Sequence, residues 1–312
     1  MKRILITGVT GFIGSNLVRY FNNQNDYLIF GHSRDGKRAV AQFENAHVEM
    51  ITTYTAAILN ERKIDTIIHM AGIAHDLSNQ YQREDYYRVN YENTKALFDE
   101  FVKSNATKFV FLSSIKAAVD TSSFPADEST APLPATDYGK SKRKAEEYIL
   151  SNPLAGGKRA YILRPCMIHG LGNKGNLNLL YRYAKIGLPF PFGSFDNKRS
   201  FLSMDNLNFI MKSFLEKDIP SGIFHVADDG YLSTKELYIV IAKELGKTPK
   251  VWNLPASFIR LLFSVVGKRA MLSKLTENMV VSNKKISQYI HTPLPLEIHE
   301  GLRKTIKSFN GE

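Results

Sequence analysis

Tyr138 and Lys142 are the residues of this sequence best suited to acid–base chemistry. They stand four positions apart in the segment Tyr-Gly-Lys-Ser-Lys, a spacing that brings both onto one face of a helix. An ammonium group beside a tyrosine favours the phenolate and lowers the pKa of the phenol. The pair could therefore exchange a proton with a substrate hydroxyl near neutral pH, and the lysine could also hold a ribose.

A serine that would complete this pair comes earlier in the chain. Ser114 follows the apolar run 109–112, 24 residues before Tyr138. The run reads as a buried strand, and open α/β sheets present their reactive groups at the carboxyl ends of strands. We therefore expect Ser114 to donate a hydrogen bond to a substrate oxygen beside Tyr138.

A glycine-rich loop lies close to the N-terminus. Gly8, Gly11 and Gly14 are spaced by three, between the apolar run 4–6 and a helical segment over 13–21. Gly8 allows a tight turn, Gly11 lets backbone N–H groups approach a pyrophosphate, and Gly14 permits close packing of helix on strand. Strand, glycine loop and helix in this order predict a dinucleotide-binding site.

The tip of the next expected strand bears on which dinucleotide is bound. Folds that bind NAD usually place an acid there, on the ribose 2′-hydroxyl, but this sequence reads Ser33-Arg34. Arg34 suits the 2′-phosphate of NADP, whereas Asp35 would supply the acid if the register slips by two. A solvated basic loop is the plain alternative, because charged loop residues are common. The sequence thus favours NADP and leaves NAD open.

The elements that must position these residues follow an alternating pattern through the first half of the chain. Short β-branched runs alternate with longer amphipathic segments, which is typical of a parallel sheet wrapped by helices. The fold class we expect is α/β, a doubly wound Rossmann sheet with a smaller C-terminal substrate-binding α/β region. The expected strands are 3–6, 27–30, 66–69, 108–112 and 160–163, and the expected helices are 13–21, 86–103 and 138–150.

The pattern becomes irregular after Pro165, where glycines and prolines interrupt it. Residues 1–165 are therefore expected to form the NAD(P)-binding domain, completed by about 203–226. Residues 166–202 and 227–312 are expected to form the substrate-binding region at the carboxyl edge of the sheet.

Composition narrows the classes of protein. The 312 residues are 44% hydrophobic, which excludes a disordered chain, and a formal charge of +11 indicates an anionic partner such as a phosphate. Basic residues do not lie within a nucleic-acid-binding motif, so nucleic acid is not an expected partner. The single cysteine, Cys166, excludes a disulfide framework, and no zinc or other metal site is expected. The apolar runs are too short for a signal peptide or a bilayer span, so we expect a soluble, cytoplasmic protein.

Together these motifs resemble the extended short-chain dehydrogenases/reductases of the NAD-dependent epimerase/dehydratase family, and the resemblance covers nearly the whole chain. Further segments that resemble family motifs are 68–72 (Ile-His-Met-Ala-Gly), 89–94 (Val-Asn-Tyr-Glu-Asn-Thr), 163–170 (Leu-Arg-Pro-Cys-Met-Ile-His-Gly, with His169 where tyrosine is usual), 197–201 and 204–207.

The resemblance implies a role for each matching position. Tyr138 would be the acid/base, Lys142 its electrostatic partner, and Ser114 the donor to the reacting C4 oxygen of a nucleotide-diphosphate sugar. Arg199 would bind the diphosphate through its guanidinium, together with the segment Asn176-Leu177. The resemblance also implies a homodimer through a four-helix interface. The implied cofactor-binding residues are Gly8, Gly11, Phe12, Ile13, Gly14, Ser33, Arg34, Ala71, Gly72, Asn90, Tyr138, Lys142 and Pro165.

Departures from the family pattern bear on the reaction. Dehydratases of the family carry acids just after the catalytic hydroxyl, where this chain has Ile115 and Lys116, so dehydration is not expected. A 4-epimerase with one retained NAD and an NADPH-dependent 4-ketoreductase of a UDP-4-keto-6-deoxyhexosamine remain, the first narrowly preferred. The Arg34 tip and the likeness of 113–116 and 272–276 to a reductase subgroup favour the second. A non-catalytic, cofactor-sensing scaffold is a further alternative.

A basic, apolar stretch lies near the C-terminal end. The segment 257–285 holds six basic residues and one acid beside the apolar residues of 258–263. Such a segment could make a weak peripheral contact with an anionic membrane. An ordinary helix packed on the substrate-binding region is the alternative that the sequence favours.

Overall fold

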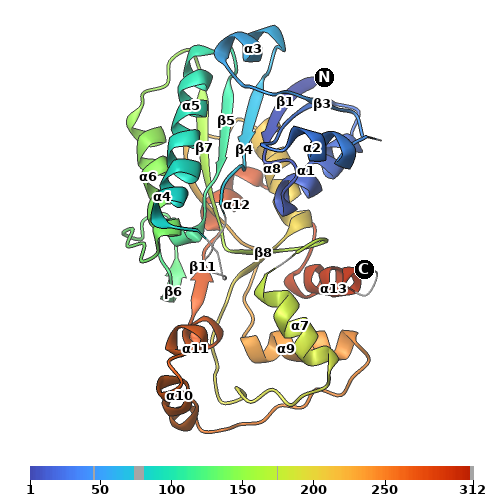
Figure 1. Ribbon diagram of the computed structural model, residues 1–312, viewed down its shortest axis with the longest axis vertical. Helices are drawn as coiled ribbons and strands as arrows, with labels where there is room; N and C mark the ends of the chain where they lie inside the picture. The colour runs from blue at the N-terminus through green and yellow to red at the C-terminus, as the bar shows by residue number, and fades with distance from the viewer. Residues whose placement is uncertain (45, 74–80, 174, 310–312) are drawn as a thin grey trace.

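A computed structural model describes residues 1–44, 46–73, 81–173 and 175–309 of the chain. Its centre is a sheet of seven parallel strands in the order β10-β7-β5-β4-β1-β2-β3 (Figure 1). This order confirms the predicted doubly wound α/β fold. The strands are β1 (Lys2–Thr7), β2 (Tyr27–His32), β3 (Val48–Met50), β4 (Thr66–His69), β5 (Lys108–Leu112), β7 (Arg159–Pro165) and β10 (Gly222–Val226).

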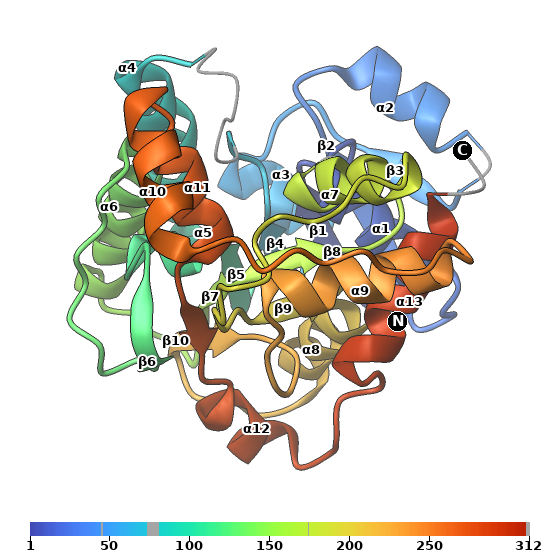
Figure 2. The same cartoon turned by 90° about the horizontal axis from the view of Figure 1, so that it is seen from below.

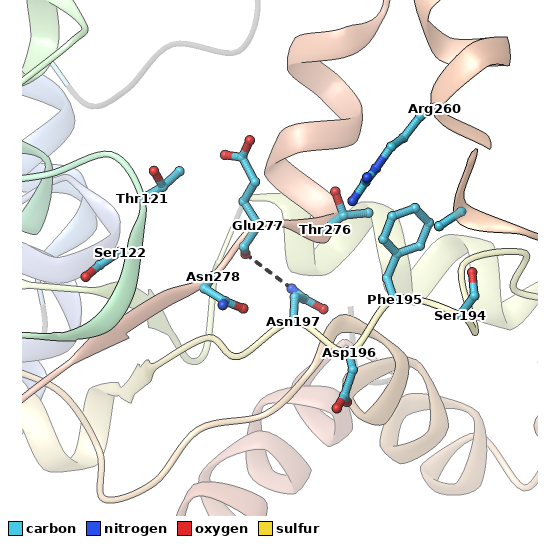
Figure 3. Close-up of a pocket in the computed structure, with 11 residues that line it drawn as sticks. Thr121, Ser122, Ser194, Phe195, Asp196, Asn197, Arg260, Thr276, Glu277 and Asn278 are labelled. Carbon is cyan, nitrogen blue, oxygen red and sulfur yellow. Dashed lines mark hydrogen bonds between the residues drawn. The ribbon is translucent and has the colours of Figure 1, made fainter. Parts of the chain in front are cut away.

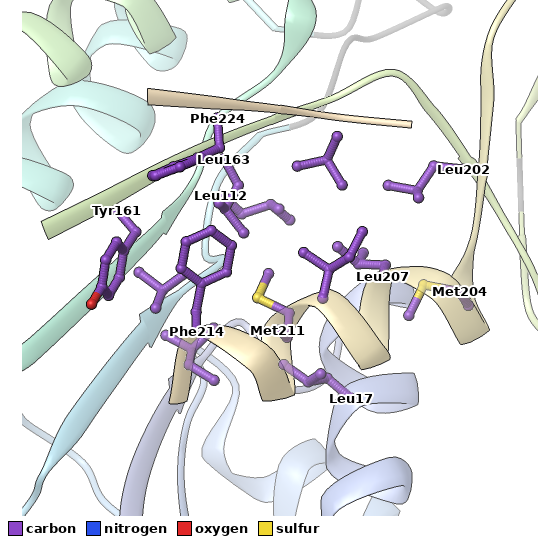
Figure 4. Close-up of a cluster of buried hydrophobic side chains, with 14 of the residues drawn as sticks. Leu17, Leu112, Tyr161, Leu163, Leu202, Met204, Leu207, Met211, Phe214 and Phe224 are labelled. Carbon is purple, nitrogen blue, oxygen red and sulfur yellow. The ribbon is translucent and has the colours of Figure 1, made fainter. Parts of the chain in front are cut away.

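Alternating side chains of the strands build a core on each face of the sheet. Ile4 and Ile6 of β1 point to one face and Leu5 to the other, as the two-residue period of a strand requires. The first face is covered by α1 (Phe12–Asn22), α2 (Gly36–Gln42), α8 (Met204–Glu216) and α12 (Lys284–Ile290), and the second by α3 (Ala56–Glu61), α5 (Asn93–Lys103) and α6 (Asp137–Ser151). Figure 4 shows how Met211 and Phe214 of α8 pack on the first face. A sheet buried on both faces explains why its strands read as nearly continuous apolar runs.

A smaller region lies beyond the carboxyl ends of the strands (Figures 1 and 2). It has its own apolar core, to which Leu177, Leu237 and Leu302 contribute from three different helices. No helix in the described part of the chain is long and apolar enough to span a membrane. The elements of this region are β6 (Ser122–Ala126) paired with β11 (Met279–Val281), β8 (Met167–His169) paired with β9 (Phe201–Ser203), α7 (Asn176–Lys185), α9 (Thr234–Glu244), α10 (Ala256–Val265), α11 (Arg269–Thr276) and α13 (Ile298–Ser308).

One predicted element differs in kind. The helix expected over 86–103 is α4 (Arg83–Tyr86), a π-helical segment (Tyr87–Glu92) and then α5. The π-turn includes Asn90, one of the predicted cofactor-binding residues. Single π-turns inside α-helices often occur at functional positions, and hydrophobic periodicity does not reveal them.

Candidate active site

A cavity of about 240 Å³ lies at the carboxyl ends of β4, β5 and β7. Seven predicted site residues line it: Phe12, Ile13, Gly72, Ser114, Tyr138, Lys142 and Pro165. The sequence analysis assigned no site role to the other lining residues, which are Met70, Ile73, Leu112, Ser113, Cys166, Ile168 and Asn173. The fold therefore brings the three predicted catalytic residues together with part of the predicted cofactor-binding set.

The glycine loop leaves no room for side chains. Gly8 has a φ of +77°, and a Cβ added there would lie 2.9 Å from the backbone of Ala71. A Cβ added at Gly14 would lie 2.2 Å from the carbonyl oxygen of Gly8. Gly11 begins α1 without a side-chain cap, and the first turn of that helix holds no acid. The loop thus presents the positive end of α1 closely enough to fit a dinucleotide pyrophosphate.

Asp35 is the acid at the tip of β2, and it also caps the next helix. The carboxylate of Asp35 accepts a hydrogen bond from the backbone N–H of Arg38 at 3.0 Å, which makes it the N-cap of α2. The Ser33 hydroxyl lies 3.1 Å from that of Thr10 in the glycine loop, and Arg34 is exposed. Ser33, Arg34 and Asp35 are thus the polar groups at the tip, and one oxygen of Asp35 is engaged in its own helix.

Tyr138 lies in the first turn of α6 and is linked by a hydrogen bond to Ser114. Burial raises the pKa of Tyr138, and the hydrogen bond with Ser114 only partly opposes this effect. The sequence argument expected Lys142 to lower this pKa, and that expectation is wrong for the protein as the structure has it. Loss of solvation outweighs the other influences on the phenol, so Tyr138 holds its proton.

Lys142 is buried one helical turn after Tyr138. Its Nζ donates a hydrogen bond to the carbonyl oxygen of Leu112 at 3.0 Å and lies 4.8 Å from the ring centre of Phe111. Burial lowers the pKa of Lys142 to about 8, against the opposing charge of Glu146. A Cβ added to Gly72 would lie 3.3 Å from this Nζ, so the ammonium faces an open cradle of backbone.

A buried ion pair joins helix α6, which carries Tyr138 and Lys142, to strand β7. Glu146, one turn after Lys142, accepts hydrogen bonds from the Nε and Nη2 of Arg164 at 2.9 and 2.6 Å. The hydroxyl of Ser113 donates to the same carboxylate at 2.5 Å. The side chains of Glu146 and Arg164 are almost completely shielded from solvent. This cluster connects α6, β7 and the end of β5, and its members carried no role in the sequence analysis.

Asn90 closes another side of the site. Its Oδ1 accepts from the backbone N–H of Ile73 at 2.8 Å, and its Nδ2 donates to the Ile73 carbonyl and to the Ser141 hydroxyl, each at 3.1 Å. A Cβ on Gly72 would lie 2.8 Å from Asn90 Oδ1. Asn90 therefore fixes the backbone after β4 and ties it to the helix of Tyr138.

A chain of hydroxyl and imidazole groups connects β1, β4 and α5. Thr7 Oγ1 lies 2.7 Å from His69 Nδ1, and His69 Nε2 lies 2.9 Å from Thr94 Oγ1, which donates to the carbonyl of Asn90 at 2.7 Å. Because the Thr94 proton is committed to Asn90, His69 Nε2 must donate to Thr94 and Nδ1 must accept from Thr7. Burial and the charge of Lys142 lower the pKa of His69 to about 3, so the ring stays neutral. His69 is thus a core histidine with both nitrogens bonded.

The predicted substrate-binding residues lie in the smaller region. Asn176 is exposed at the first position of α7, whereas the side chain of Leu177 is buried in that region's core. The Nη1 of Arg199 donates to the carbonyl of Glu277 at 3.1 Å. Arg199 and Cys166 influence each other's pKa, which places Arg199 near the cavity of Tyr138, although it does not line that cavity. Burial raises the pKa of the Cys166 thiol, so this cysteine suits packing rather than nucleophilic attack.

Glu277, whose carbonyl holds Arg199, lines a second cavity of about 550 Å³. Figure 3 shows residues that line this cavity. The carbonyl of Glu277 at its edge also accepts a hydrogen bond from Asn197 at 3.4 Å. Arg260 of α10 enters the same cavity from the opposite side. The larger cavity is therefore polar, with the cation Arg260 and the acids Asp196 and Glu277 among its lining residues, and it lacks the acid–base pair of the smaller cavity.

Comparison with known proteins agrees with this geometry. The family model "NAD dependent epimerase/dehydratase family" matches residues 4–227. UDP-glucose 4-epimerase from Vibrio cholerae is 29% identical, over 99% of this chain and 95% of that protein. An epimerase from Escherichia coli O157:H7 that acts on N-acetyl-alpha-D-glucosaminyl-diphospho-ditrans,octacis-undecaprenol is 22% identical over 97% of this chain and 94% of its own length.

A solved structure of UDP-N-acetylglucosamine 4-epimerase from Bacillus cereus superposes on the whole of both chains with a TM-score of 0.79, at 20% sequence identity. This likeness shows the fold, and the family model shows the membership. The chain therefore belongs to the NAD dependent epimerase/dehydratase family and is an enzyme of the extended short-chain dehydrogenase/reductase type.

Proposed function

We propose that this enzyme is a nucleotide-sugar 4-epimerase, acting at C4 of a UDP-hexose or a UDP-N-acetylhexosamine. The observation that carries the proposal is the cavity where Ser114, Tyr138 and Lys142 meet beside a glycine loop that fits a dinucleotide. The similarity to the V. cholerae UDP-glucose 4-epimerase over nearly the full length of both chains supports the same reaction.

The residues present fit NAD or NADP. Bound NAD would supply the hydride acceptor and donor that epimerisation at C4 needs. The loop of Gly8, Gly11 and Gly14 would hold the dinucleotide pyrophosphate. These glycines have no side chains, so the pyrophosphate could approach the backbone N–H groups at the start of α1. Lys142 would hold a ribose from its position beside Gly72.

The proton chemistry belongs to the protein. Tyr138 would first lose its own proton to solvent, and the phenolate would then take the proton from the C4 hydroxyl and later return it to the C4 oxygen. Ser114 would donate a hydrogen bond to that same oxygen. The ammonium of Lys142 stabilises Tyr138 while the latter is a phenolate. Because Leu112 holds this ammonium in place, its charge is oriented before the substrate binds.

The diphosphate of the substrate would bind in the smaller region. The guanidinium of Arg199 can hold two phosphate oxygens at once, and its bond to the Glu277 carbonyl fixes its direction. The segment Asn176-Leu177 would meet the same diphosphate with backbone at the start of α7, since the side chain of Leu177 is buried in the core.

A 4-ketoreductase that uses NADPH is the second candidate, and two observations favour it. Arg34 is exposed at the tip of β2, where its guanidinium could meet a 2′-phosphate, and the neighbouring Asp35 holds one of its oxygens on the backbone of α2. Tyr138 holds its proton because burial raises its pKa, and a proton donor is what reduction of a ketone requires. The substrate would then be a UDP-4-keto-6-deoxyhexosamine.

The test is to incubate the purified enzyme with UDP-galactose and with UDP-N-acetylgalactosamine, without added dinucleotide, and to follow the sugars by NMR. We expect at least one to equilibrate with its 4-epimer. Tyr138→Phe should lower kcat by about 10² to 10⁴, the usual contribution of an acid/base group. Tyr148→Phe on the same helix, whose hydroxyl bonds to Asp99, is the matched control and should keep its activity. Failure of the wild type to convert either sugar, with consumption of NADPH on a 4-keto sugar, would instead establish the reductase.

A further inference from the structure

Helix α10 carries more exposed large apolar side chains than any other helix in the described part of the chain. Leu261, Leu262 and Val265 are between 50% and 78% exposed, and Phe258 lies within this range at the start of the helix. Their spacing of three and four residues places them on one face. Val266, directly after the helix, extends the same apolar surface.

The opposite face of α10 attaches the helix to the protein. Ile259 is buried and packs with Phe195 and Leu272 in a small cluster that Phe263 flanks. Arg260 points into the cavity of Figure 3. One face of α10 is therefore packed on the protein, and the other face is left exposed. The helix lies at the lower end of the molecule in Figure 1.

The charge of this segment has a single sign. Between Leu245 and Thr276 the sequence contains no acid and six basic residues: Lys247, Lys250, Arg260, Lys268, Arg269 and Lys274. Lys268 and Arg269 are exposed immediately after the apolar face. An apolar face bordered by cations complements a surface that is apolar inside and anionic outside.

We propose that α10 docks this enzyme on the surface of a bilayer that contains anionic lipids. Leu261, Leu262 and Val265 would enter the boundary between headgroups and acyl chains, and Lys268 and Arg269 would contact the headgroups. The helix has ten residues and is therefore about 15 Å long, so it lies along the surface rather than across the bilayer. The docked enzyme would hold the cavity of Arg260 close to the lipid headgroups.

A second copy of the chain is a poorer occupant for this face. A two-fold interface would bring the basic residues of one copy against the same residues of the other, and like charges in an interface are unfavourable. One helix of ten residues also offers less than the area of about 800 Å² per partner that a stable interface usually buries. The proposal does not depend on which sugar the enzyme converts.

The experiment is sedimentation of the purified protein with phosphatidylcholine vesicles, with and without phosphatidylglycerol, at low and high salt. We expect pelleting with the anionic vesicles at low salt and less of it at high salt. Leu261→Glu combined with Val265→Glu, and separately Lys268→Glu combined with Arg269→Glu, should weaken binding at least about tenfold. Val40→Glu, on the exposed side of α2, is the matched control and should bind as the wild type does.

Two further readouts locate the contact. Conversion of soluble nucleotide sugar without vesicles should be the same for all these variants, which separates this proposal from the proposed reaction. The emission of Trp252, the single tryptophan, should shift to shorter wavelength with anionic vesicles, because it precedes α10 and is exposed. The proposal would be overturned if the wild type did not pellet at low salt. It would also be overturned if both double variants still pelleted and Trp252 emission did not shift. If the Leu261→Glu, Val265→Glu variant had a different oligomeric state from the wild type, the exposed face of α10 would be an interface between two copies of the chain, which would contradict the proposal.

Discussion

The Nζ of Lys142 donates a hydrogen bond to the carbonyl of Leu112 at 3.0 Å, and this contact ties helix α6 to the end of strand β5. Ser114 follows Leu112 by two residues, and Tyr138 precedes Lys142 by one helical turn. The distance between the two hydroxyl-bearing residues is therefore set by the meeting of a helix and a strand. Preorganisation of this kind is what places a proton donor correctly before the substrate arrives.

Lys142 should set the alkaline limit of activity. Burial lowers its pKa to about 8, so kcat/KM should fall as the pH rises above 8 and the ammonium loses its charge. Stability should change in the opposite direction: the unfolded lysine binds a proton up to its ordinary value of 10.5, so the free energy of unfolding gains from Lys142 between pH 8 and 10.5. Rate and urea-melt profiles measured together separate titration from unfolding. Lys142→Met should not show the alkaline fall in kcat/KM. A wild-type kcat/KM that stays constant through pH 9 would contradict a role for the Lys142 charge in activity.

Glu146 should act as a positioning residue through Ser113 and Arg164. Glu146→Gln leaves the buried guanidinium of Arg164 without a charge partner, and breaking a buried pair typically costs about 3 to 5 kcal/mol. We expect a lower melting temperature and a lower kcat with little change in KM, because β5 and α6 lose their common anchor. Glu147→Gln is the matched control, since Glu147 is exposed and pairs with Arg143 on the surface. Equal stability and kcat in the two variants would rule out this positioning role.

Gly14 should be essential for dinucleotide binding. A Cβ at this position would lie 2.2 Å from the carbonyl oxygen of Gly8, so Gly14→Ala must push α1 away from the loop. We expect loss of bound dinucleotide and a stability cost of about 1 to 3 kcal/mol, the usual effect of overpacking. Gly36→Ala is the control, because a Cβ there meets no atom within 4 Å. Calorimetric titration with NAD checks both, and normal affinity in Gly14→Ala would show that the loop is not the pyrophosphate site.

His69 should make the fold sensitive to acid. Its folded pKa is about 3 against 6.5 in the unfolded chain, so only the unfolded state gains a proton as the pH falls below 6.5. At pH 5 this residue should lower the free energy of unfolding by about 2 kcal/mol, at 1.36 kcal/mol for each pH unit below 6.5. His69→Gln should flatten the pH dependence of urea unfolding between pH 7 and 5, whereas exposed His47→Gln should leave it unchanged. Parallel wild-type and His69→Gln curves would contradict the neutral, doubly bonded imidazole.

Much of the fold could be predicted because both faces of its sheet are buried. Strands β4 and β5 lie at the predicted bounds, since their continuous apolar runs end sharply at polar residues. The interruption of the helix around Asn90 was not predicted, because π-turns are rare and depend on contacts with other parts of the chain. Within this turn Asn90 bonds to Ile73 and Ser141, which lie far from it in the chain.

The site shows the same division between local and long-range information. The glycine loop and the Tyr138–Lys142 pair are local patterns, so their spacing in the sequence was enough to predict a dinucleotide-binding loop and an acid–base pair. The raised pKa of Tyr138 was missed because burial depends on elements that only tertiary packing brings together. The position of Glu146, four residues after Lys142 on the same helix face, could have marked it as a site residue. Its partner Arg164 could not be predicted, because it lies on strand β7 and meets Glu146 only in the folded protein.

The identity of the dinucleotide that the enzyme carries tests the central claim most directly. Freshly purified protein would be denatured, the released dinucleotide identified and counted by mass spectrometry, and the stripped protein titrated with NAD and with NADPH. We expect close to one NAD per chain, retained through purification, because a 4-epimerase regenerates its cofactor in every turnover. An empty site that prefers NADPH, with the preference lost in Arg34→Ser, would contradict the epimerase and make the enzyme a 4-ketoreductase.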